Sequence, residues 1–194
     1  MRRYRMLLGI AGVTGTGKSY YKDKLVERLD FEKVKIITTR EMRKGEKNNE
    51  DKVFVSKEEL QNLREEGKIA YEFNLLGYTY AYTKEELFSD KNMVFEVHYD
   101  TIYEFKKVCP NMRVLYLFPQ DLEIAKEKTK ERHLAPEVEE KRLLEIDEHY
   151  ERMKTDTDLR NMFNYIQYNN YDKESEDRII DFIEKIMLEE NKTK

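Results

Sequence analysis

The residues of this chain best suited to chemistry are 12–19, which read GVTGTGKS. They fit the P-loop pattern, in which a glycine and four further residues precede Gly-Lys-Ser or Gly-Lys-Thr. Glycine lets backbone N–H groups approach phosphate oxygens closely, and a following helix presents its positive end to the anion. Lys18 would reach the β- and γ-phosphates, and the Ser19 hydroxyl would hold Mg²⁺. We therefore expect this loop to bind a nucleotide.

The sequence around the loop supports this interpretation. Residues 6–11 are short and apolar like a buried parallel strand, and Leu25, Val26 and Leu29 repeat at helical spacing. An ordinary glycine-rich turn is the alternative, and the complete motif between a strand and a helix argues against it. The expected ligands of the ATP phosphates are Gly12, Thr14, Gly15, Thr16, Gly17, Lys18, Ser19 and Tyr20.

Composition bounds the class of protein. The chain has 194 residues, enough for one α/β domain, and 39% of them are charged, but the net charge is only −4. That balance excludes nucleic-acid binding built on bulk positive charge. Residues 6–11 are too short to span a bilayer, and the one cysteine, Cys109, excludes an intramolecular disulfide. We expect a cytoplasmic monomer or homodimer with no nucleic-acid or membrane partner, and Cys109 as a packing residue at a helix end.

Strands and helices alternate along most of the chain, which predicts a mostly parallel sheet covered on both faces. Strands are expected at 34–39, 53–55, 69–75, 78–82, 93–97, 114–118 and 162–168. Two helices are expected after capping boxes that pair Ser56 with Glu59 and Thr83 with Glu86. Later helices are expected near 102–105, from 122, from 136 and at 179–186. The β-rich piece at about 34–82 interrupts the alternation and is expected to form a separate lobe over the P-loop edge.

A second anion site is expected within residues 38–46, which read TTREMRKGE. Arg40 and Arg43 are three residues apart in a charged loop. One guanidinium group can donate two parallel hydrogen bonds to the oxygens of one phosphate. A solvated charged loop is the alternative. With a P-loop upstream, a clamp for the phosphate of an acceptor molecule is the favoured interpretation.

Together these motifs resemble the guanylate kinase family. The resemblance rests on the P-loop, TTR-x-x-R-x-GE at 38–46, Phe-Val-Ser at 54–56, the hairpin at 77–80 and Asn169 before the last helix. It implies an α/β fold of the P-loop NTPase type, with three layers, a central parallel sheet, an inserted β-rich lobe for a nucleoside monophosphate and a helical lid. Residues 1–194 would form a single domain, with the core at 1–33 and 84–190, the lobe at about 34–83 and the lid at about 126–142.

The resemblance also assigns roles by position. Arg40, Arg43 and Tyr80 match ligands of the acceptor's monophosphate, whereas Arg132 and Arg142 match arginines that reach the transferring phosphates. The expected catalytic residues are Lys18, Arg40, Arg132 and Arg142. Further acceptor ligands implied are Thr39, Tyr71, Glu72, Tyr82, Glu96 and His98, with Glu96 also near Mg²⁺ through water and Asn169 on the adenine side. The alternatives are a solvated helix end for Arg132, the edge of the core for Arg142 and packing for Tyr80.

The departures from the family pattern fall on the positions that read the base. Where the family has hydroxyl and acidic side chains, this chain has Ile36, Tyr71 or Glu72 (the register differs by one), Tyr82 and His98. Lys52 replaces a phosphate-binding tyrosine. Loss of side chains that hydrogen-bond to the base weakens the preference for guanine over other bases. The carboxylate of Glu72 would still accept hydrogen bonds from guanine N1–H and the 2-amino group. The histidines His98, His133 and His149 have no metal-ligand spacing.

The leading hypothesis is an ATP-dependent nucleoside monophosphate kinase that transfers the γ-phosphoryl group of Mg·ATP to GMP or dGMP. One alternative is a kinase for a different or modified nucleoside monophosphate. Another is a non-catalytic domain that binds proteins, against which the intact Lys18 and Ser19 argue. A generic P-loop ATPase leaves Arg40 and Arg43 unexplained. The lobe and the lid are expected to close over bound nucleotides, because water must be excluded.

Overall fold

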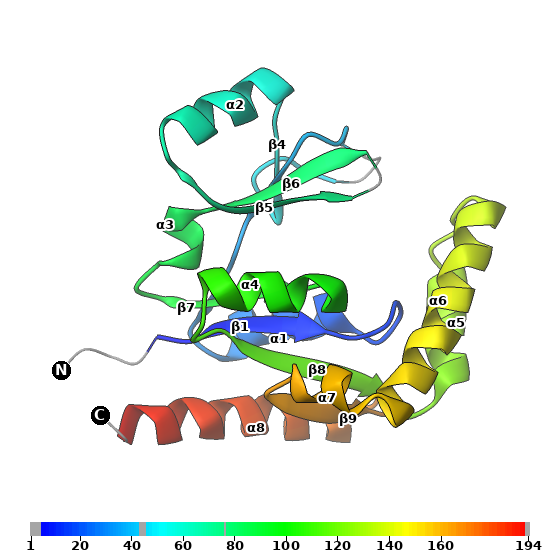
Figure 1. Cartoon of the computed structure of the whole chain (residues 1–194). Helices are drawn as coiled ribbons and strands as arrows, with labels where there is room; N and C mark the ends of the chain where they lie inside the picture. Colours follow the sequence, from blue (N-terminus) through cyan, green and yellow to red (C-terminus); the bar gives the residue numbers. More distant parts are fainter. Residues whose placement is uncertain (1–4, 43–45, 76, 193–194) are drawn as a thin grey trace.

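The computed structural model describes residues 5–42, 46–75 and 77–192 and places a parallel sheet between two layers of helices (Figure 1). The sheet has the strand order β2-β7-β1-β8-β9. Its strands are β1 (Leu7–Ala11), β2 (Phe31–Lys33), β7 (Asn92–Glu96), β8 (Arg113–Pro119) and β9 (Tyr165–Asn169). Helices α1 (Lys18–Arg28) and α8 (Lys173–Lys192) cover one face, and α4 (Ile102–Val108) and α7 (Thr157–Asn161) cover the other. The α/β fold with a central parallel sheet is therefore confirmed.

A second sheet forms a lobe beside the first, with the strand order β4-β3-β6-β5. Its elements are β3 (Ile36–Thr38), β4 (Lys52–Phe54), α2 (Lys57–Glu65), β5 (Ile69–Leu75) and β6 (Tyr78–Thr83), and α3 (Lys84–Leu87) leads back to the core. Helix α2 covers the outer face of this sheet, where Ile37, Leu60 and Ala81 form a small core. The other face is turned toward β1 and α4 (Figure 1).

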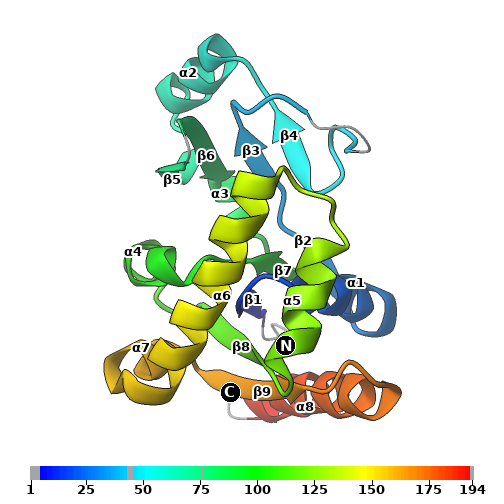
Figure 2. The same ribbon diagram turned by 90° about the vertical axis from the view of Figure 1, so that its right-hand side faces the viewer.

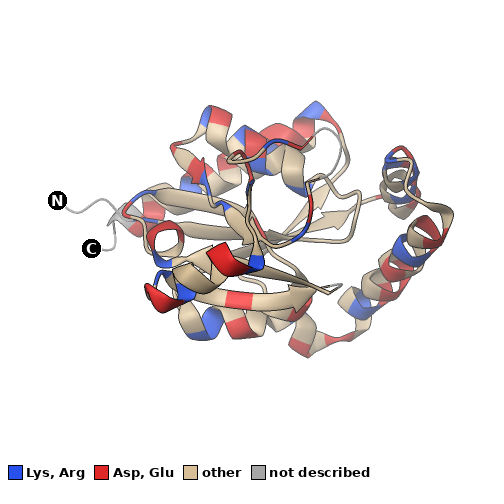
Figure 3. Cartoon of the chain, turned by 90° about the horizontal axis from the view of Figure 1, so that it is seen from above, with Lys and Arg blue, Asp and Glu red and all other residues tan. Residues whose placement is uncertain are grey.

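A helical hairpin of α5 (Leu122–Lys130) and α6 (Pro136–Thr155) projects along the side of both sheets (Figure 2). An ion pair of 2.7 Å between Lys126 and Asp147 links its two helices. Basic and acidic residues are interspersed along the helices, as Figure 3 shows. Within the described ranges, no helix combines the length and the apolar character needed to cross a membrane.

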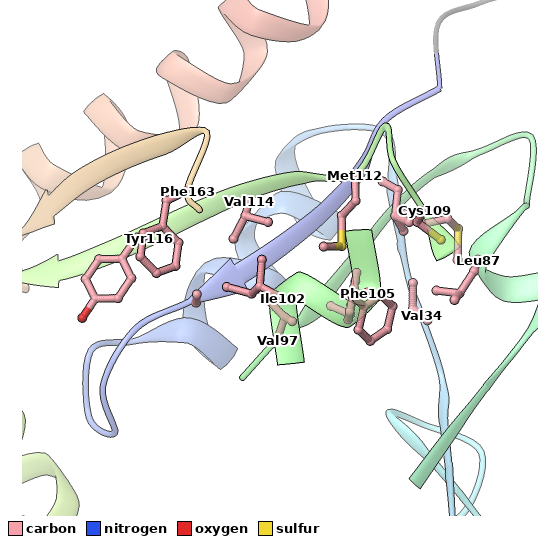
Figure 4. Packing of buried hydrophobic residues seen from close by; sticks show 14 of the residues in the cluster. Val34, Leu87, Val97, Ile102, Phe105, Cys109, Met112, Val114, Tyr116 and Phe163 are labelled. Carbon is pink, nitrogen blue, oxygen red and sulfur yellow. The ribbon is translucent and has the colours of Figure 1, made fainter. Parts of the chain in front are cut away.

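The three inner strands of the central sheet, β7, β1 and β8, are largely apolar on both faces, as expected where helices cover both sides. Leu8 and Ile10 of β1 pack toward α1 and α8, whereas Leu7 and Ala11 pack toward α4. The second of these clusters also contains Cys109, which ends α4 and is buried (Figure 4). Cys109 is thus the packing residue that the sequence predicts.

Three local predictions are wrong or incomplete. The strand expected at 34–39 is only the short β3 (Ile36–Thr38), which pairs with β4 and β6 in the lobe, and the strand just before it, β2, which pairs with β7 in the core, was not predicted. The box at Thr83 is half formed, since Glu86 accepts from the backbone N–H of Lys35 instead. The last strand begins at Tyr165 rather than 162, because Asp156 caps the extra helix α7. The box between Ser56 and Glu59 is complete.

Candidate active site

Lys18 lies inside the P-loop, at the start of α1. Its ammonium group donates to the carbonyl oxygens of Gly12 at 3.0 Å and Val13 at 2.8 Å. Burial lowers the pKa of Lys18 to about 8, and two arginines of the α5–α6 hairpin lower it too, while Glu96 works against the shift. The loop therefore presents a cation that can exchange two carbonyl partners for phosphate oxygens.

Two loop glycines are required by their surroundings. Gly15 has φ of +84°, and a Cβ there would lie 2.1 Å from the carbonyl oxygen of Ala125 in α5. Gly12 has φ of +150°, and a Cβ there would lie 2.7 Å from the carbonyl oxygen of Leu117 in β8. The loop is thus packed directly against the backbone of its neighbours. Thr16 is turned inward, because its buried hydroxyl donates to the carbonyl oxygen of Val13.

Glu96, at the end of β7, connects the loop with the lobe. The Ser19 hydroxyl donates to its carboxylate at 2.8 Å, and Lys22 lies 3.3 Å from the same oxygen and 2.9 Å from Asp51 of the lobe. Burial works to raise the pKa of Glu96, but Lys18, Lys22 and the bond from Ser19 together hold it below its ordinary value. An ionised carboxylate therefore stands beside the P-loop hydroxyl.

This pair of oxygens fits Mg²⁺. The ion prefers oxygen ligands and is usually bound by one or two protein groups together with substrate phosphates. Ser19 and Glu96 supply a hydroxyl and a carboxylate that are joined by a hydrogen bond of 2.8 Å. In the part of the chain that the structure describes, no three His, Cys, Asp or Glu residues gather into a protein-only metal site.

Asn169, at the end of β9, anchors the P-loop through a hydrogen bond. Its side-chain N–H donates to the carbonyl oxygen of Thr16 at 2.9 Å, and its side-chain oxygen accepts from the Tyr21 hydroxyl at 3.0 Å. The same oxygen accepts from the backbone N–H of Tyr171 at 2.9 Å. The side chain is 2% exposed, so Asn169 shapes the site and presents little surface to a ligand.

A pocket of about 450 Å³ opens beside Asn169 and the start of α1. Tyr20 and Tyr171 contribute rings to it, and Lys128 of α5 lies 5.8 Å from the centre of the Tyr171 ring. The Tyr20 hydroxyl donates to Glu176 of α8. We call this cavity the outer pocket; it offers aromatic surface next to the phosphate loop.

A second cavity, the central pocket, separates the P-loop from α6. Its wall includes Thr14 and Lys18 of the loop and Arg142 and His149 of α6. Arg142 donates to Glu145 at 2.7 Å. His149 is 2% exposed, and neither ring nitrogen has a hydrogen-bond partner among the described residues. Burial, and to a lesser degree nearby cations, lowers the pKa of His149 to about 4, so this ring is neutral at pH 7.

Three aromatic rings in the wall of the central pocket, His98, Tyr99 and His149, form a stack. His98 lies 4.3 Å from Tyr99, and Tyr99 lies 3.7 Å from His149, measured between ring centres. Burial lowers the pKa of His98. Arg132, between the hairpin helices, is exposed. The hairpin therefore brings Arg142 to the pocket wall, with Arg132 close enough to influence Lys18.

A third cavity, the cleft pocket, lies between the lobe and the central sheet. Its wall is formed by Lys22, Val34, Ile36, Asp51, Lys52, Tyr80, Tyr82, Phe95 and Glu96. Arg40 is nearby and buried, and its guanidinium donates to both carboxylate oxygens of Glu46, at 2.8 and 2.9 Å. Glu46, followed more weakly by Tyr80, raises the pKa of Arg40. Arg43 lies outside the described residues.

The structure of the β5–β6 hairpin shows which of the neighbours Tyr71 and Glu72 faces the cleft. Tyr71 points inward, with its ring centre 4.4 Å from that of Phe105 in α4. Glu72 points to the outer face, where both of its oxygens accept from Arg64 of α2. Of the two residues that the sequence leaves open, Tyr71 is therefore the one on the cleft side and Glu72 the one on the outer face, because alternate residues of a strand face opposite sides. Thr39 accepts from the backbone N–H of Thr79 and ties the arginine loop to this hairpin.

Sequence reasoning missed three residues of the site. Lys22 and Asp51 meet across the cleft from elements far apart in the chain, and their sequence context gives no signal for this pair. His149 carried a signal, since it lies between Ile146 and Met153 on the apolar stripe of α6. A histidine at a core position of a helix is a candidate for a buried polar role.

The fold and this loop define a protein of the P-loop nucleotide-binding class. A family model described as guanylate kinase matches residues 4–186. A guanylate kinase of Lactiplantibacillus plantarum is 29% identical over 128 residues, which is 63% of this chain and 62% of that protein. One of Mesoplasma florum is 25% identical over 189 residues, or 94% of this chain and 62% of that protein. The chain belongs to the guanylate kinase family.

A solved structure supports the fold. The crystal structure of a guanylate kinase from Anaplasma phagocytophilum matches with a TM-score of 0.65 and 20% identity, over 98% of this chain and 88% of that one. The matches to the first curated relatives span only about three fifths of their length, 62% and 61% for the two first relatives.

Proposed function

We propose that this chain transfers the γ-phosphoryl group of ATP to GMP or dGMP in the presence of Mg²⁺. The observation that carries the proposal is the position of Glu96, which lines both the central pocket beside the P-loop and the cleft pocket under the lobe. Two phosphate sites that share one wall can bring a donor and an acceptor phosphate together. Family membership supports the choice of acceptor.

The donor nucleotide would bind along the P-loop. Its phosphates would replace the carbonyl oxygens that now accept from Lys18, and its adenine would enter the outer pocket beside Tyr20, Tyr171 and Asn169. Ser19 and Glu96 would hold Mg²⁺, which when bound neutralises charge on the phosphates. Thr14 and Gly17 line the two neighbouring pockets and would help to enclose the phosphate chain.

The acceptor would bind in the cleft pocket. Arg40 and Tyr80, with Arg43, would clamp its phosphate, with Glu46 giving up its bonds to Arg40 on binding. Arg142, and Arg132 once the hairpin closes, would stabilise the charge that spreads over the transferring group. Catalysis would then consist mainly of positioning and electrostatic stabilisation, with no general base required.

The hairpin and the lobe would close over the two nucleotides. A closed site excludes water and so prevents idle hydrolysis of ATP. We place this activity in the cytoplasm, with the chain acting as a monomer or homodimer. Small-angle scattering tests the closure: compaction is expected when both nucleotides are bound, and an unchanged radius of gyration would contradict it.

The activity itself is tested by ADP formation from Mg·ATP with GMP and with dGMP. Lys18→Ala should lower kcat at least about 100-fold, because it removes a cation aimed at the transferring phosphate. Lys24→Ala is the matched control, since Lys24 lies on the same helix and pairs with Glu27 at its surface. ADP formation by the unmodified chain that does not exceed the Lys18→Ala rate would refute the proposal.

A further inference from the structure

Lys52, the first residue of β4, lies in the wall of the cleft pocket and has no role in the reaction proposed above. It pairs with Ile36 of β3, which lines the same pocket. Val53, the next residue along the strand, packs against the small core under α2. Because alternate residues of a strand face opposite sides, Lys52 points toward the cleft. It also borders a smaller cavity, whose wall includes Glu46.

Lys52 and Arg40 share one carboxylate, that of Glu46. The ammonium nitrogen of Lys52 lies 3.3 Å from Oε1 of Glu46. Arg40 donates to the same oxygen at 2.8 Å and to Oε2 at 2.9 Å. The side chain of Lys52 is 33% exposed and that of Arg40 is 8% exposed. Two cationic groups therefore converge on a single internal anion beside the cleft pocket.

The guanidinium group of Arg40 is held in place from two further sides. Its central carbon lies 5.3 Å from the centre of the Phe54 ring, and one of its nitrogens donates to the carbonyl oxygen of Glu41 at 2.6 Å. Phe54 is two residues after Lys52 in β4, so both side chains lie on the same face of the strand. Arg40 is thus the fixed member of the pair, whereas Lys52 carries its charge on a flexible four-carbon stem.

The two cations suit a phosphate better than they suit a carboxylate. The carboxylate of Glu46 carries one negative charge, whereas a phosphate monoester carries about −1.5 to −2 at pH 7 and has three acceptor oxygens. A guanidinium can bind two of these oxygens in a fork, and an ammonium can bind the third as a point charge. A phosphate that displaces Glu46 would therefore bind Arg40 and Lys52 together.

We propose that Lys52 is a ligand of the acceptor's phosphate, and that Glu46 holds Lys52 and Arg40 together until that phosphate displaces it. The inference rests on the proposed kinase function and adds a binding residue to the acceptor site. The group that Lys52 recognises is the phosphate monoester alone. Its contribution is therefore absent for a nucleoside, which has the same base and sugar but no phosphate.

Nuclear magnetic resonance titration of the full chain with GMP and with guanosine tests this role. Lys52→Met keeps the length of the side chain but removes its charge, and it should raise the dissociation constant for GMP about 10-fold. That factor is the lower end for a hydrogen bond to a charged group, because part of the Lys52 side chain is exposed to water. The dissociation constant for guanosine should stay within about 2-fold. An unchanged value for GMP, or an equal loss for guanosine, would overturn the inference.

Two further variants show whether contact or overall charge is responsible. Lys47→Met is the matched control, because Lys47 precedes β4 in the same segment, is 76% exposed and pairs with Glu50 at 3.2 Å. It removes the same charge and should leave the dissociation constant for GMP within about 2-fold. Lys52→Arg should restore most of the affinity that Lys52→Met loses, since a guanidinium also donates to phosphate. A Lys47→Met variant as weak as Lys52→Met, or a Lys52→Arg variant equally weak, would overturn the inference.

Initial rates separate failure of this inference from failure of the kinase proposal. Lys52→Met should raise KM for GMP about 10-fold and leave KM for ATP within about 2-fold, because Lys52 lines neither the central nor the outer pocket. Normal turnover with an unchanged KM for GMP would leave the kinase intact and refute the role of Lys52. If the unmodified chain forms no ADP, the kinase proposal fails and the titrations still decide; absence of GMP binding to the unmodified chain would overturn the inference as well.

Discussion

Replacing Asn169 by leucine should loosen the P-loop and destabilise the whole domain. The side chain of Asn169 is buried and bonds the Thr16 carbonyl, the Tyr21 hydroxyl and the Tyr171 N–H. Leucine has a similar size but no polar atoms, so these three groups lose their partner. Ser175, which also contacts Asn169 at 3.3 Å, keeps its bond to the Asp172 carbonyl.

The cost can be worked out from these groups. A buried polar group without a partner costs about 1–3 kcal/mol. At the lower end of that range, three groups cost about 3 kcal/mol, a large part of a typical stability of about 5–15 kcal/mol. With a urea m-value of about 2 kcal/mol/M, the midpoint of unfolding would fall by roughly 1.5 M. KM for ATP should also rise, because Thr16 belongs to the phosphate loop.

Urea unfolding followed by far-UV circular dichroism measures the first effect, and initial rates against ATP concentration measure the second. Asn170→Ala is the control, because Asn170 is the exposed neighbour of Asn169, and it should change stability by less than about 0.5 kcal/mol. An Asn169→Leu variant as stable as the control, with unchanged KM for ATP, would refute the view that Asn169 holds the loop.

Two further predictions concern pH. Because burial lowers the pKa of Lys18 to about 8, kcat/KM for ATP should fall as pH rises through about 8, and a profile that stays flat from about pH 7 to 9.5 would contradict this. The pKa of His149 is lowered from 6.5 to about 4 in the folded chain, so the unfolded chain binds the extra proton between these values. The unfolding free energy should therefore decrease as pH falls from about 6.5 to 4, by at most about 3 kcal/mol, and His149→Phe should remove this slope in urea titrations.

Parts of the site that are contiguous in sequence could be predicted, and parts that depend on distant contacts could not. The strand, the P-loop and the helix follow one another along the chain, so both the conformation and the chemistry of residues 12–19 can be predicted from the sequence. Lys22 and Asp51 meet only because the lobe folds back over α1. Neither residue belongs to a recognisable motif, and an ion pair across a cleft leaves no local pattern.

The sequence leaves open which of Tyr71 and Glu72 faces the cleft for a different reason. The pairing of β5 with β6 shifts between Ile69 and Tyr71, so the alternation of inner and outer residues cannot be counted from the start of the strand. A shift of one residue moves every following side chain to the other face. The sequence predicts the hairpin itself, but the face of each residue depends on this irregularity.

The packing of Gly12 and Gly15 against the backbones of β8 and α5 bears on how this chain can change over evolutionary time. Any side chain at either position would collide with a carbonyl oxygen of a neighbouring element, so the donor loop has no acceptable single replacement there. Tyr80 and Tyr82 of the β5–β6 hairpin line the cleft pocket with side chains instead, and neither is held in place by a backbone collision of this kind. If the proposed function holds, divergence within this architecture is therefore easier at the acceptor site than at the P-loop.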